Sequence, residues 1–196
     1  MVLVVDFYDS FTYNLVHYFE NAGEEVEIVF HDQLIIESLP SYSLVVLSPG
    51  PGLPEEKENL FTCISYCRQN RIPIFGVCLG FQALGISLGA ELANQLTVKH
   101  GVSERLSWIS DSSILFQGIQ KNSLVGLYHS WKLVSVPEKY LSSISEEKVA
   151  MSLESSDEYI LGVQFHPESI LTTEGFKLIE NVISWKNGLK KQRDFS

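Results

Sequence analysis

The sequence predicts an α/β fold: a mostly parallel central sheet with helices on both faces, plus a small antiparallel β elaboration in the C-terminal half. Short, continuously apolar runs, typical of strands buried on both faces, alternate with segments whose apolar residues recur at helical spacing. One such run, residues 72–77, passes directly into a helical segment through a turn that contains glycine. After Gly89 the segments become shorter and richer in turn residues, which predicts the antiparallel part.

The first half of the chain supplies the first strands and helices in order. Val2–Val5 is an apolar run that ends in Asp6, and a helix follows it, with candidate N-cap residues in Asp9–Thr12 and an end at Gly23. Ser48–Gly52 is a turn, because its two prolines lack the N–H groups that a helix or a strand ladder needs. The other elements predicted here are strands at Glu25–Phe30 and Leu44–Leu47 and a helix at Glu55–Asn70.

A nucleophile elbow is predicted between residues 72 and 89. Ile72–Val77 reads as a buried strand and Leu79–Leu88 as a helix, and the turn between them is Gly76-x-Cys78-x-Gly80. The glycines remove side chains that would clash at so sharp a turn, and the positive end of the helix dipole favours a thiolate at its tip. The alternative is that Cys78 is one more buried core thiol.

The second half of the chain predicts β structure and one closing helix. Gly175–Leu189 has the apolar spacing of an amphipathic helix. Since no linker, repeat or low-complexity tract interrupts the chain, residues 1–196 are expected to form a single domain. The antiparallel segments are predicted near Ser103–Trp108, Ser123–His129, Lys132–Val136, Val149–Leu153 and Tyr159–Phe165.

Composition excludes several classes of function. The 196 residues are 45% hydrophobic with a formal net charge of −10, which is unlike the basic footprint of a nucleic-acid-binding protein. The apolar start of the chain is too short for a signal peptide or a membrane span, so a soluble, cytoplasmic protein is expected. Cys63 and Cys67 are four residues apart but lack further ligands at metal-binding spacing, so no metal and no cofactor are expected in this chain.

A nucleophilic thiolate needs a base and a group that orients the base. His166 follows the apolar run 162–165 and precedes Pro167, which restricts it to an extended conformation. In an extended stretch residues two apart point the same way, so Glu168 can accept the ring N–H of His166. The alternative is a strand-end histidine that caps a loop beside an incidental acid.

The turn Ser48–Gly52 supplies a third element of the site. Gly50 has no side chain and stands between two prolines that stiffen the turn, an arrangement that suits backbone donation to an oxyanion or a carboxylate. Because it follows a strand, this turn is expected at the same sheet edge as Asp6 and Cys78, where ligands bind in parallel sheets. The alternative is an ordinary strand-exit loop.

Five motifs taken together resemble the class I glutamine amidotransferases, most closely the small glutaminase subunit of anthranilate synthase and of aminodeoxychorismate synthase. The resemblance extends over about residues 2–185. The motifs are Asp9-Ser-Phe-Thr12-x-Asn14, Ser48-Pro-Gly-Pro-Gly52, Gly76-Val-Cys-Leu-Gly80-x-Gln82, Tyr128-His-Ser130 and Gly162-Val-Gln-Phe-His-Pro-Glu-Ser169.

The resemblance implies a reaction and roles for individual residues. Cys78 would attack the side-chain amide of L-glutamine to form a γ-glutamyl thioester, and His166, oriented by Glu168, would protonate the departing ammonia and then activate water. Gly50 and Leu79 would donate the oxyanion N–H groups. Ammonia would pass to a larger chorismate-binding synthase subunit, which the Asp9–Asn14 region helps to contact. The groups implied to hold glutamine are Gln82, Ser130, the Trp131 backbone and the turn formed by Gly50, Pro51 and Gly52.

Four positions differ from the usual pattern of that family: Phe7, Phe81, Val102 and Trp131. None of them belongs to the Cys78, His166 and Glu168 set. Two other functions stay open at this point: a stand-alone cysteine hydrolase of γ-glutamyl compounds, and a non-catalytic interaction subunit. Whether the partner makes anthranilate, aminodeoxychorismate or both is also open.

Overall fold

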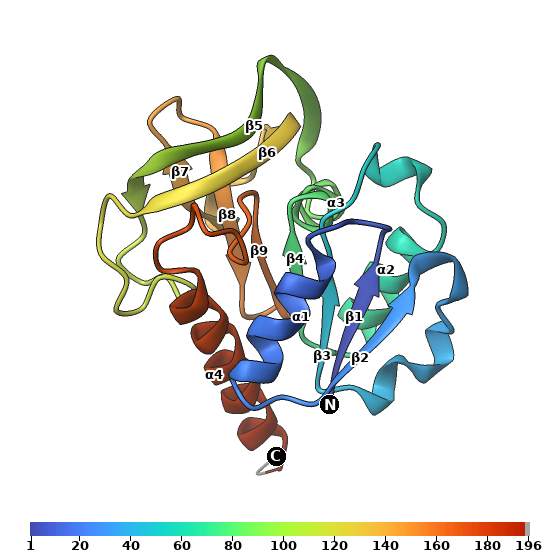
Figure 1. The fold of residues 1–196 in the computed structure, drawn as a ribbon. Coiled ribbons are helices and arrows are strands. Elements are labelled where there is room, and N and C mark those ends of the chain that lie inside the picture. The colour runs from blue at the N-terminus through green and yellow to red at the C-terminus, as the bar shows by residue number, and fades with distance from the viewer. Residues whose placement is uncertain (195–196) are drawn as a thin grey trace.

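A mixed sheet forms the centre of the molecule (Figure 1). The computed structural model describes the backbone of residues 1–194 and the side chains of residues 1–95 and 97–190, and within this part nine strands pair in the order β2-β1-β3-β4-β9-β8-β7-β5-β6. The parallel strands are β1 (Val2–Asp6), β2 (Val26–Phe30), β3 (Leu44–Leu47), β4 (Ile74–Val77) and β9 (Ile160–Val163). The antiparallel strands are β5 (Glu91–Ile109), β6 (Leu124–Val134), β7 (Leu141–Ser145) and β8 (Ala150–Ser155).

Helices cover both faces of the parallel part, because the strands there are apolar on both sides. In β1, Val2 and Val4 belong to the core on the side of α1 (Thr12–Asn21) and α4 (Gly175–Asp194). Leu3 and Val5 face the opposite core, which α2 and α3 cover. These helices and the short 3₁₀ helices are α2 (Leu60–Gln69), α3 (Leu79–Ser87), η1 (His31–Gln33), η2 (Ile36–Ser41), η3 (Pro54–Glu56) and η4 (Glu138–Tyr140). The predicted α/β fold with helices on both faces is therefore confirmed.

Two helix predictions need correction. The helix predicted over Glu55–Asn70 is a 3₁₀ turn followed by α2, because Lys57 is extended and Asn59 is left-handed with φ 63°. No side chain caps α1, whose N-cap is Phe11; Asp9 instead accepts the Phe11 N–H at 2.8 Å.

Several strand predictions are also wrong in extent or pairing. β5 begins at Glu91 rather than near Ser103, Lys132–Val136 is largely the end of β6, and β7 was not predicted. The most important correction concerns Tyr159–Phe165, which was predicted as part of the antiparallel elaboration. This segment contains β9, which belongs to both halves of the sheet. β9 pairs in parallel with β4 and antiparallel with β8, and so joins the two halves of the sheet. Sequence spacing cannot reveal this pairing, because its two partners are about 85 residues apart.

The pairing of β4 with β9 positions the site. Their register sets Val77 opposite Val163, so the residues that follow the two strands emerge side by side. β1 and β3 are neighbours as well, and the chain leaves β1 toward β2 on one side and enters β3 on the other. Such a change of direction leaves a crevice beyond the carboxyl ends of the strands, where ligands bind in open α/β sheets. The segments after β1, β3, β4 and β9 therefore meet at one edge of the sheet.

Candidate active site

Cys78 occupies a strained turn between β4 and α3. Its φ is 51° and its ψ −98°, a conformation that residues with a side chain rarely adopt, and it is the N-cap of α3. Its N–H donates to the Val163 carbonyl oxygen at 2.9 Å, and its own carbonyl accepts the Gln82 N–H at 3.0 Å. The thiol lies where the unpaired N–H groups of a helix start are concentrated.

The two glycines of the elbow are required by close packing. A Cβ atom on Gly76 would lie 2.5 Å from the carbonyl carbon of Gly80, and a Cβ on Gly80 would lie 2.4 Å from the carbonyl oxygen of Leu47. Real Cβ contacts are almost never shorter than 3.0 Å. The prediction that these glycines remove clashing side chains is therefore confirmed, with β3 and the start of α3 as the surfaces in contact.

His166 and Glu168 lie in the segment that follows β9. The His166 N–H donates to the Gly126 carbonyl at 3.0 Å, and the Thr172 hydroxyl donates to the His166 carbonyl at 2.6 Å. The His166 Nδ1 is 2.7 Å from Glu168 Oε1, so the predicted hydrogen bond is present. The segment is not extended as predicted: Pro167 and Glu168 form a turn, in which the Ser169 N–H donates to the His166 carbonyl at 3.2 Å. His166 and Glu168 are buried, with exposures of 2% and 4%.

The imidazole of His166 has an unusual electrostatic environment. Burial by itself lowers its pKa, but the neighbouring Cys78 thiol and Glu168 carboxylate more than offset burial and raise the pKa to about 10. Among the described residues, none is a hydrogen-bond partner of its buried Nε2 atom. With Nδ1 engaged by Glu168, Nε2 is the nitrogen available for proton transfer with Cys78 and a substrate.

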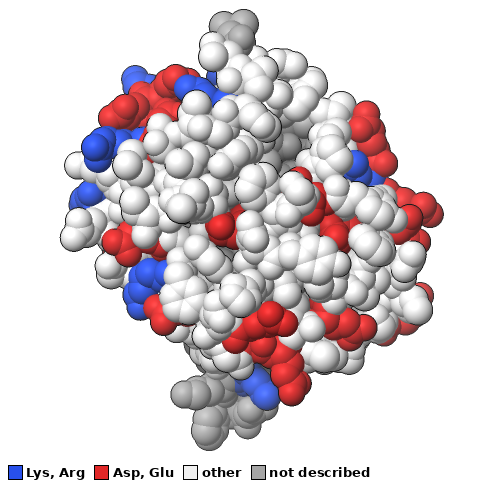
Figure 2. All heavy atoms as spheres, in the orientation of Figure 1, with Lys and Arg blue, Asp and Glu red and all other residues white. Residues whose placement is uncertain are grey.

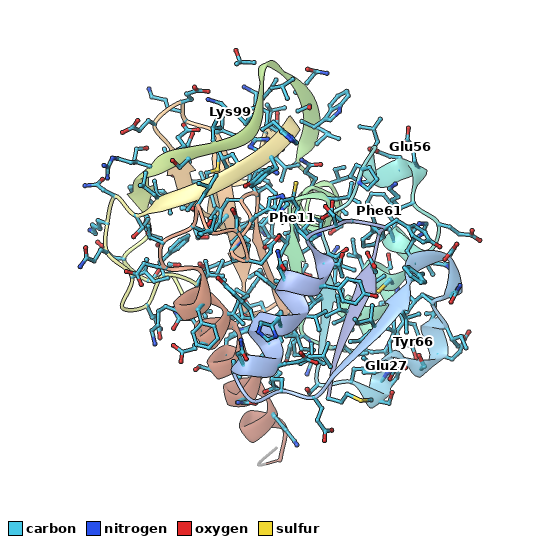
Figure 3. All side chains as sticks on the ribbon, in the orientation of Figure 1. Phe11, Glu27, Glu56, Phe61, Tyr66 and Lys99 are labelled. Atoms are coloured by element: carbon cyan, nitrogen blue, oxygen red, sulfur yellow. The ribbon has the colours of Figure 1, made fainter. Side chains whose placement is uncertain are left out.

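Two aromatic rings hold the imidazole from the side of α1 and β6. The ring centroids of Phe11 and Tyr128 lie 5.1 Å and 5.0 Å from that of His166, and 4.9 Å from each other. Phe11 lies at the start of α1, between that helix and the β5–β6 hairpin (Figure 3). Asp6 fixes this segment by accepting the Tyr8 N–H at 2.9 Å and the Thr12 hydroxyl at 2.8 Å.

The turn Ser48–Gly52 lies against the elbow. The Ser48 hydroxyl accepts the Phe7 N–H at 3.1 Å and ties the end of β3 to the end of β1. A Cβ on Gly50 would lie 2.7 Å from Leu79 Cδ2, so this turn and the first residue of α3 are in direct contact. Gly50 is half-buried, whereas Pro51 and Gly52 are exposed. Gly52 has a φ of +79°, which favours glycine.

Gln82 links α3 to β6, the strand that contains Ser130 and Trp131. Gln82 is 3% exposed, and its Nε2 donates to the Trp131 carbonyl at 3.0 Å. Ser130 is half-buried in β6, at a place where the pairing with β5 shifts register between Asn94 and Lys99. Contacts in the described structure thus link Gly50 to Leu79 and Gln82 to the Trp131 carbonyl, whereas no described hydrogen bond joins Ser130, Pro51 or Gly52 to Cys78.

Sequence reasoning missed Gln164. It is fully buried, accepts a hydrogen bond from Gln82 at 3.1 Å through Oε1, and donates from Nε2 to Cys78 Sγ at 3.6 Å. The signal was present, since Gln164 is the one polar residue in the apolar run 162–165. His129 was quoted only as part of a motif; it is buried, and its Nδ1–H donates to the Trp131 carbonyl at 2.8 Å.

The four departures from the family pattern lie in different environments. Phe7 and Phe81 are fully buried in the core between the sheet and the helices α2 and α3. Phe7 also stacks on His31, with ring centroids 5.3 Å apart. Trp131 is half-buried, and Val102, on β5, is 41% exposed.

Within the described part of the chain, His, Cys, Asp and Glu side chains do not cluster in a group that could hold a metal ion. The helices described here include none with the length and apolar character needed to cross a membrane. On the face drawn in Figure 2, basic side chains are scattered, several of them beside acidic ones, around a largely uncharged centre.

Comparisons with known proteins agree with this geometry. The family model described as glutamine amidotransferase class-I matches residues 3–185. Anthranilate synthase component 2 of Helicobacter pylori (strain ATCC 700392 / 26695) is 32% identical over 194 residues, covering 96% of this chain and 98% of that protein. Aminodeoxychorismate/anthranilate synthase component 2 of Bacillus subtilis is 35% identical over 190 residues, covering 93% of this chain and 95% of that protein.

A longer relative and a solved structure extend the comparison. Aminodeoxychorismate synthase of Streptomyces griseus is 38% identical over 183 residues, but this chain spans only 25% of that protein. A glutamine amidotransferase from Thermotoga maritima has the same fold, with a TM-score of 0.71 at 21% identity over 98% of this chain and 84% of its own. With a family model that matches most of its length and relatives above 30% identity, the chain belongs to the class I glutamine amidotransferases.

Proposed function

We propose that this protein is a glutaminase subunit that hydrolyses L-glutamine to glutamate and ammonia through a thioester on Cys78. The observation that carries the proposal is the environment of His166. Its ring is bonded to Glu168 through Nδ1 at 2.7 Å, and its pKa is raised by Cys78 and Glu168 to about 10. A histidine that is oriented by a carboxylate, with its other ring nitrogen unpartnered among the described residues, suits proton transfer beside a cysteine nucleophile.

The reaction follows from these positions. The Cys78 sulfur attacks the side-chain carbonyl carbon of glutamine, and the carbonyl oxygen becomes an oxyanion that the N–H groups of Gly50 and Leu79 stabilise. When the C–N bond breaks, His166 Nε2 donates its proton to the departing nitrogen, and ammonia leaves. Nε2 then takes a proton from water, which attacks the thioester and releases glutamate. Glu168 orients the ring throughout.

The remaining predicted residues are assigned to glutamine itself. These residues are Gln82, Ser130, the Trp131 backbone and the turn formed by Gly50, Pro51 and Gly52. We assign to these groups the α-amino and α-carboxylate ends of the substrate. No cofactor is assigned to this chain, since each step uses its own side chains or backbone groups.

The ammonia is proposed to pass to a larger, chorismate-binding synthase subunit, which makes anthranilate or 4-amino-4-deoxychorismate. The support is the naming of the full-length relatives as component 2 of such synthases. In the Streptomyces griseus protein the matching part is a quarter of the whole, as expected of a glutaminase unit joined to a synthase. We also propose that the protein is cytoplasmic.

Two measurements test the proposal. Incubation of the purified chain with a glutamine-mimicking electrophile, with and without its partner, is expected to give a mass adduct on Cys78; no adduct with the partner present would rule out the enzymatic function. In the complex, Cys78→Ala is expected to abolish glutamine-dependent synthesis and to leave ammonia-dependent synthesis intact. Loss of both in a folded complex would mean that Cys78 has another role, and full glutaminase activity without a partner would favour a stand-alone hydrolase.

A further inference from the structure

Gln164 provides a contact to the nucleophile that the proposed mechanism does not use. Its side chain is fully buried between β9 and the elbow, and its Nε2 lies 3.6 Å from Cys78 Sγ. The contact follows from the sheet, because the register of Val77 with Val163 brings the next residues, Cys78 and Gln164, together. A buried amide has to find partners for its N–H and C=O groups, so the position of each end carries information.

The direction of this amide is fixed by a chain of hydrogen bonds that begins at a backbone carbonyl. The Trp131 carbonyl can only accept, so the group of Gln82 that faces it at 3.0 Å is the NH₂. The same NH₂ is 3.1 Å from Gln164, whose facing atom is therefore the oxygen Oε1. The NH₂ of Gln164 is left at the other end, and that end faces Cys78.

His129 donates to the same carbonyl at which the series of hydrogen bonds begins. Its Nδ1 is 2.8 Å from the same Trp131 carbonyl, so Nδ1 carries the proton and donates. Burial lowers the pKa of His129 to about 4, although the bond to Trp131 opposes this change. The ring is therefore neutral at neutral pH, and the donor and acceptor roles in the series of hydrogen bonds do not change there.

An N–H group that points at sulfur favours the charged form of the sulfur, because a thiolate accepts hydrogen bonds better than a thiol does. The effect is large where water is excluded, and Gln164 is 0% and Cys78 7% exposed. We propose that Gln164 is a positioning residue that holds Cys78 as a thiolate, its amide being aimed by the Trp131 carbonyl through Gln82. The proposal rests on the proposed function only in taking Cys78 as the nucleophile.

The test is the pH profile of Cys78 alkylation by iodoacetamide, followed by mass spectrometry of the peptide that contains Cys78. Gln164→Met keeps the length of the side chain and removes the donor, and Gln164→Glu keeps its shape and replaces the donor by an acceptor. A hydrogen bond to a charged group contributes about 1.5 kcal/mol or more, so we expect the midpoint of the alkylation profile to rise by about one pH unit in Gln164→Met and further in Gln164→Glu. Below the midpoint, where the rate follows the thiolate fraction, this shift slows alkylation about tenfold. His166, whose ring also interacts with Cys78, is unchanged in both variants. At high pH, where the thiol is fully ionised, both variants are expected to reach the wild-type rate.

A matched control is Gln95→Met. Gln95 is also a buried amide, 6% exposed on β5, but none of its hydrogen bonds reaches Cys78 or Gln82 in the described structure, and its Oε1 has no partner there. Its alkylation profile is expected to match that of the wild type. Circular dichroism and thermal unfolding establish that each variant is folded, and Gln164→Glu serves as the test if Gln164→Met does not fold.

The outcomes separate this proposal from its alternatives. A midpoint equal to that of the wild type in a folded Gln164 variant would overturn it. A uniform loss of rate at every pH would also overturn it, because it would indicate a packing role rather than stabilisation of a thiolate. Alkylation needs neither glutamine nor a partner subunit, so failure of the proposed glutaminase function would appear in a different experiment.

Discussion

Gly80→Ala is expected to displace Cys78 and the start of α3 from the rest of the site. The new Cβ would lie 2.4 Å from the Leu47 carbonyl oxygen and 2.6 Å from Leu47 Cβ, both in the middle of the parallel sheet. Ordinary contact begins at 3.4 Å, so relief of the clash with the oxygen requires a movement of 3.4 − 2.4 = 1.0 Å. Since β3 is held on both sides by β1 and β4, the start of α3 has to move, and Cys78 moves with it.

The size of the effect follows from that displacement. Inserting a methyl group into a tightly packed region costs about 1–3 kcal/mol of stability. A displacement of about 1 Å between reacting groups reduces catalytic rates by about 100-fold. His166 does not move with α3, because it is held by bonds to Gly126 and Thr172. We therefore expect a folded but weakened protein with glutaminase activity about 100-fold lower.

Gly188→Ala is the matched control. Gly188 lies in α4, and a Cβ there would have no atom within 4 Å. The same chemical change is expected to stabilise the protein by about 0.5–1 kcal/mol, because alanine is the better helix former. Urea unfolding measures both stabilities, and labelling of Cys78 with a glutamine-mimicking electrophile measures the site. Wild-type stability and labelling in Gly80→Ala would refute the packing argument.

Three further predictions concern charged groups. We expect His166→Ala to lower glutaminase kcat by about 100-fold or more and Glu168→Gln to lower it less, since Glu168 acts only through the ring; equal rates for wild type and His166→Ala would discard the proton-transfer role. Because the pKa of His166 is raised from 6.5 to about 10, its protonation stabilises the fold fully below pH 6.5, and this contribution is lost as the pH rises toward 10. Urea unfolding from about pH 7 to about pH 9 is therefore expected to show a steeper loss of stability in the wild type than in His166→Gln, and parallel curves would contradict this. Lys186 and Glu24 form a partly buried ion pair at 2.6 Å, so Lys186→Met is expected to destabilise the protein by about 2 kcal/mol and the Lys186→Met/Glu24→Leu double variant by less. Equal thermal stability of the two variants would count against the pair.

The sequence determined those features that depend on neighbouring residues. Apolar runs and helical spacing are local, and they gave the strands of the parallel half and the elbow at Cys78. The His166–Glu168 bond was also expected, but from an extended backbone, whereas the structure has a turn at Pro167 and Glu168. The family resemblance, itself a pattern of short motifs, led to the residues grouped around the elbow.

The tertiary structure decided what depends on pairing between distant segments. β9 was predicted as part of the antiparallel elaboration, but it also pairs in parallel with β4, and this pairing brings the segments of Cys78 and His166 together. Gln164 became visible for the same reason, since its partners Cys78 and Gln82 lie about 80 residues away. Local sequence propensity does not predict such contacts, because they depend on the packing of the whole sheet.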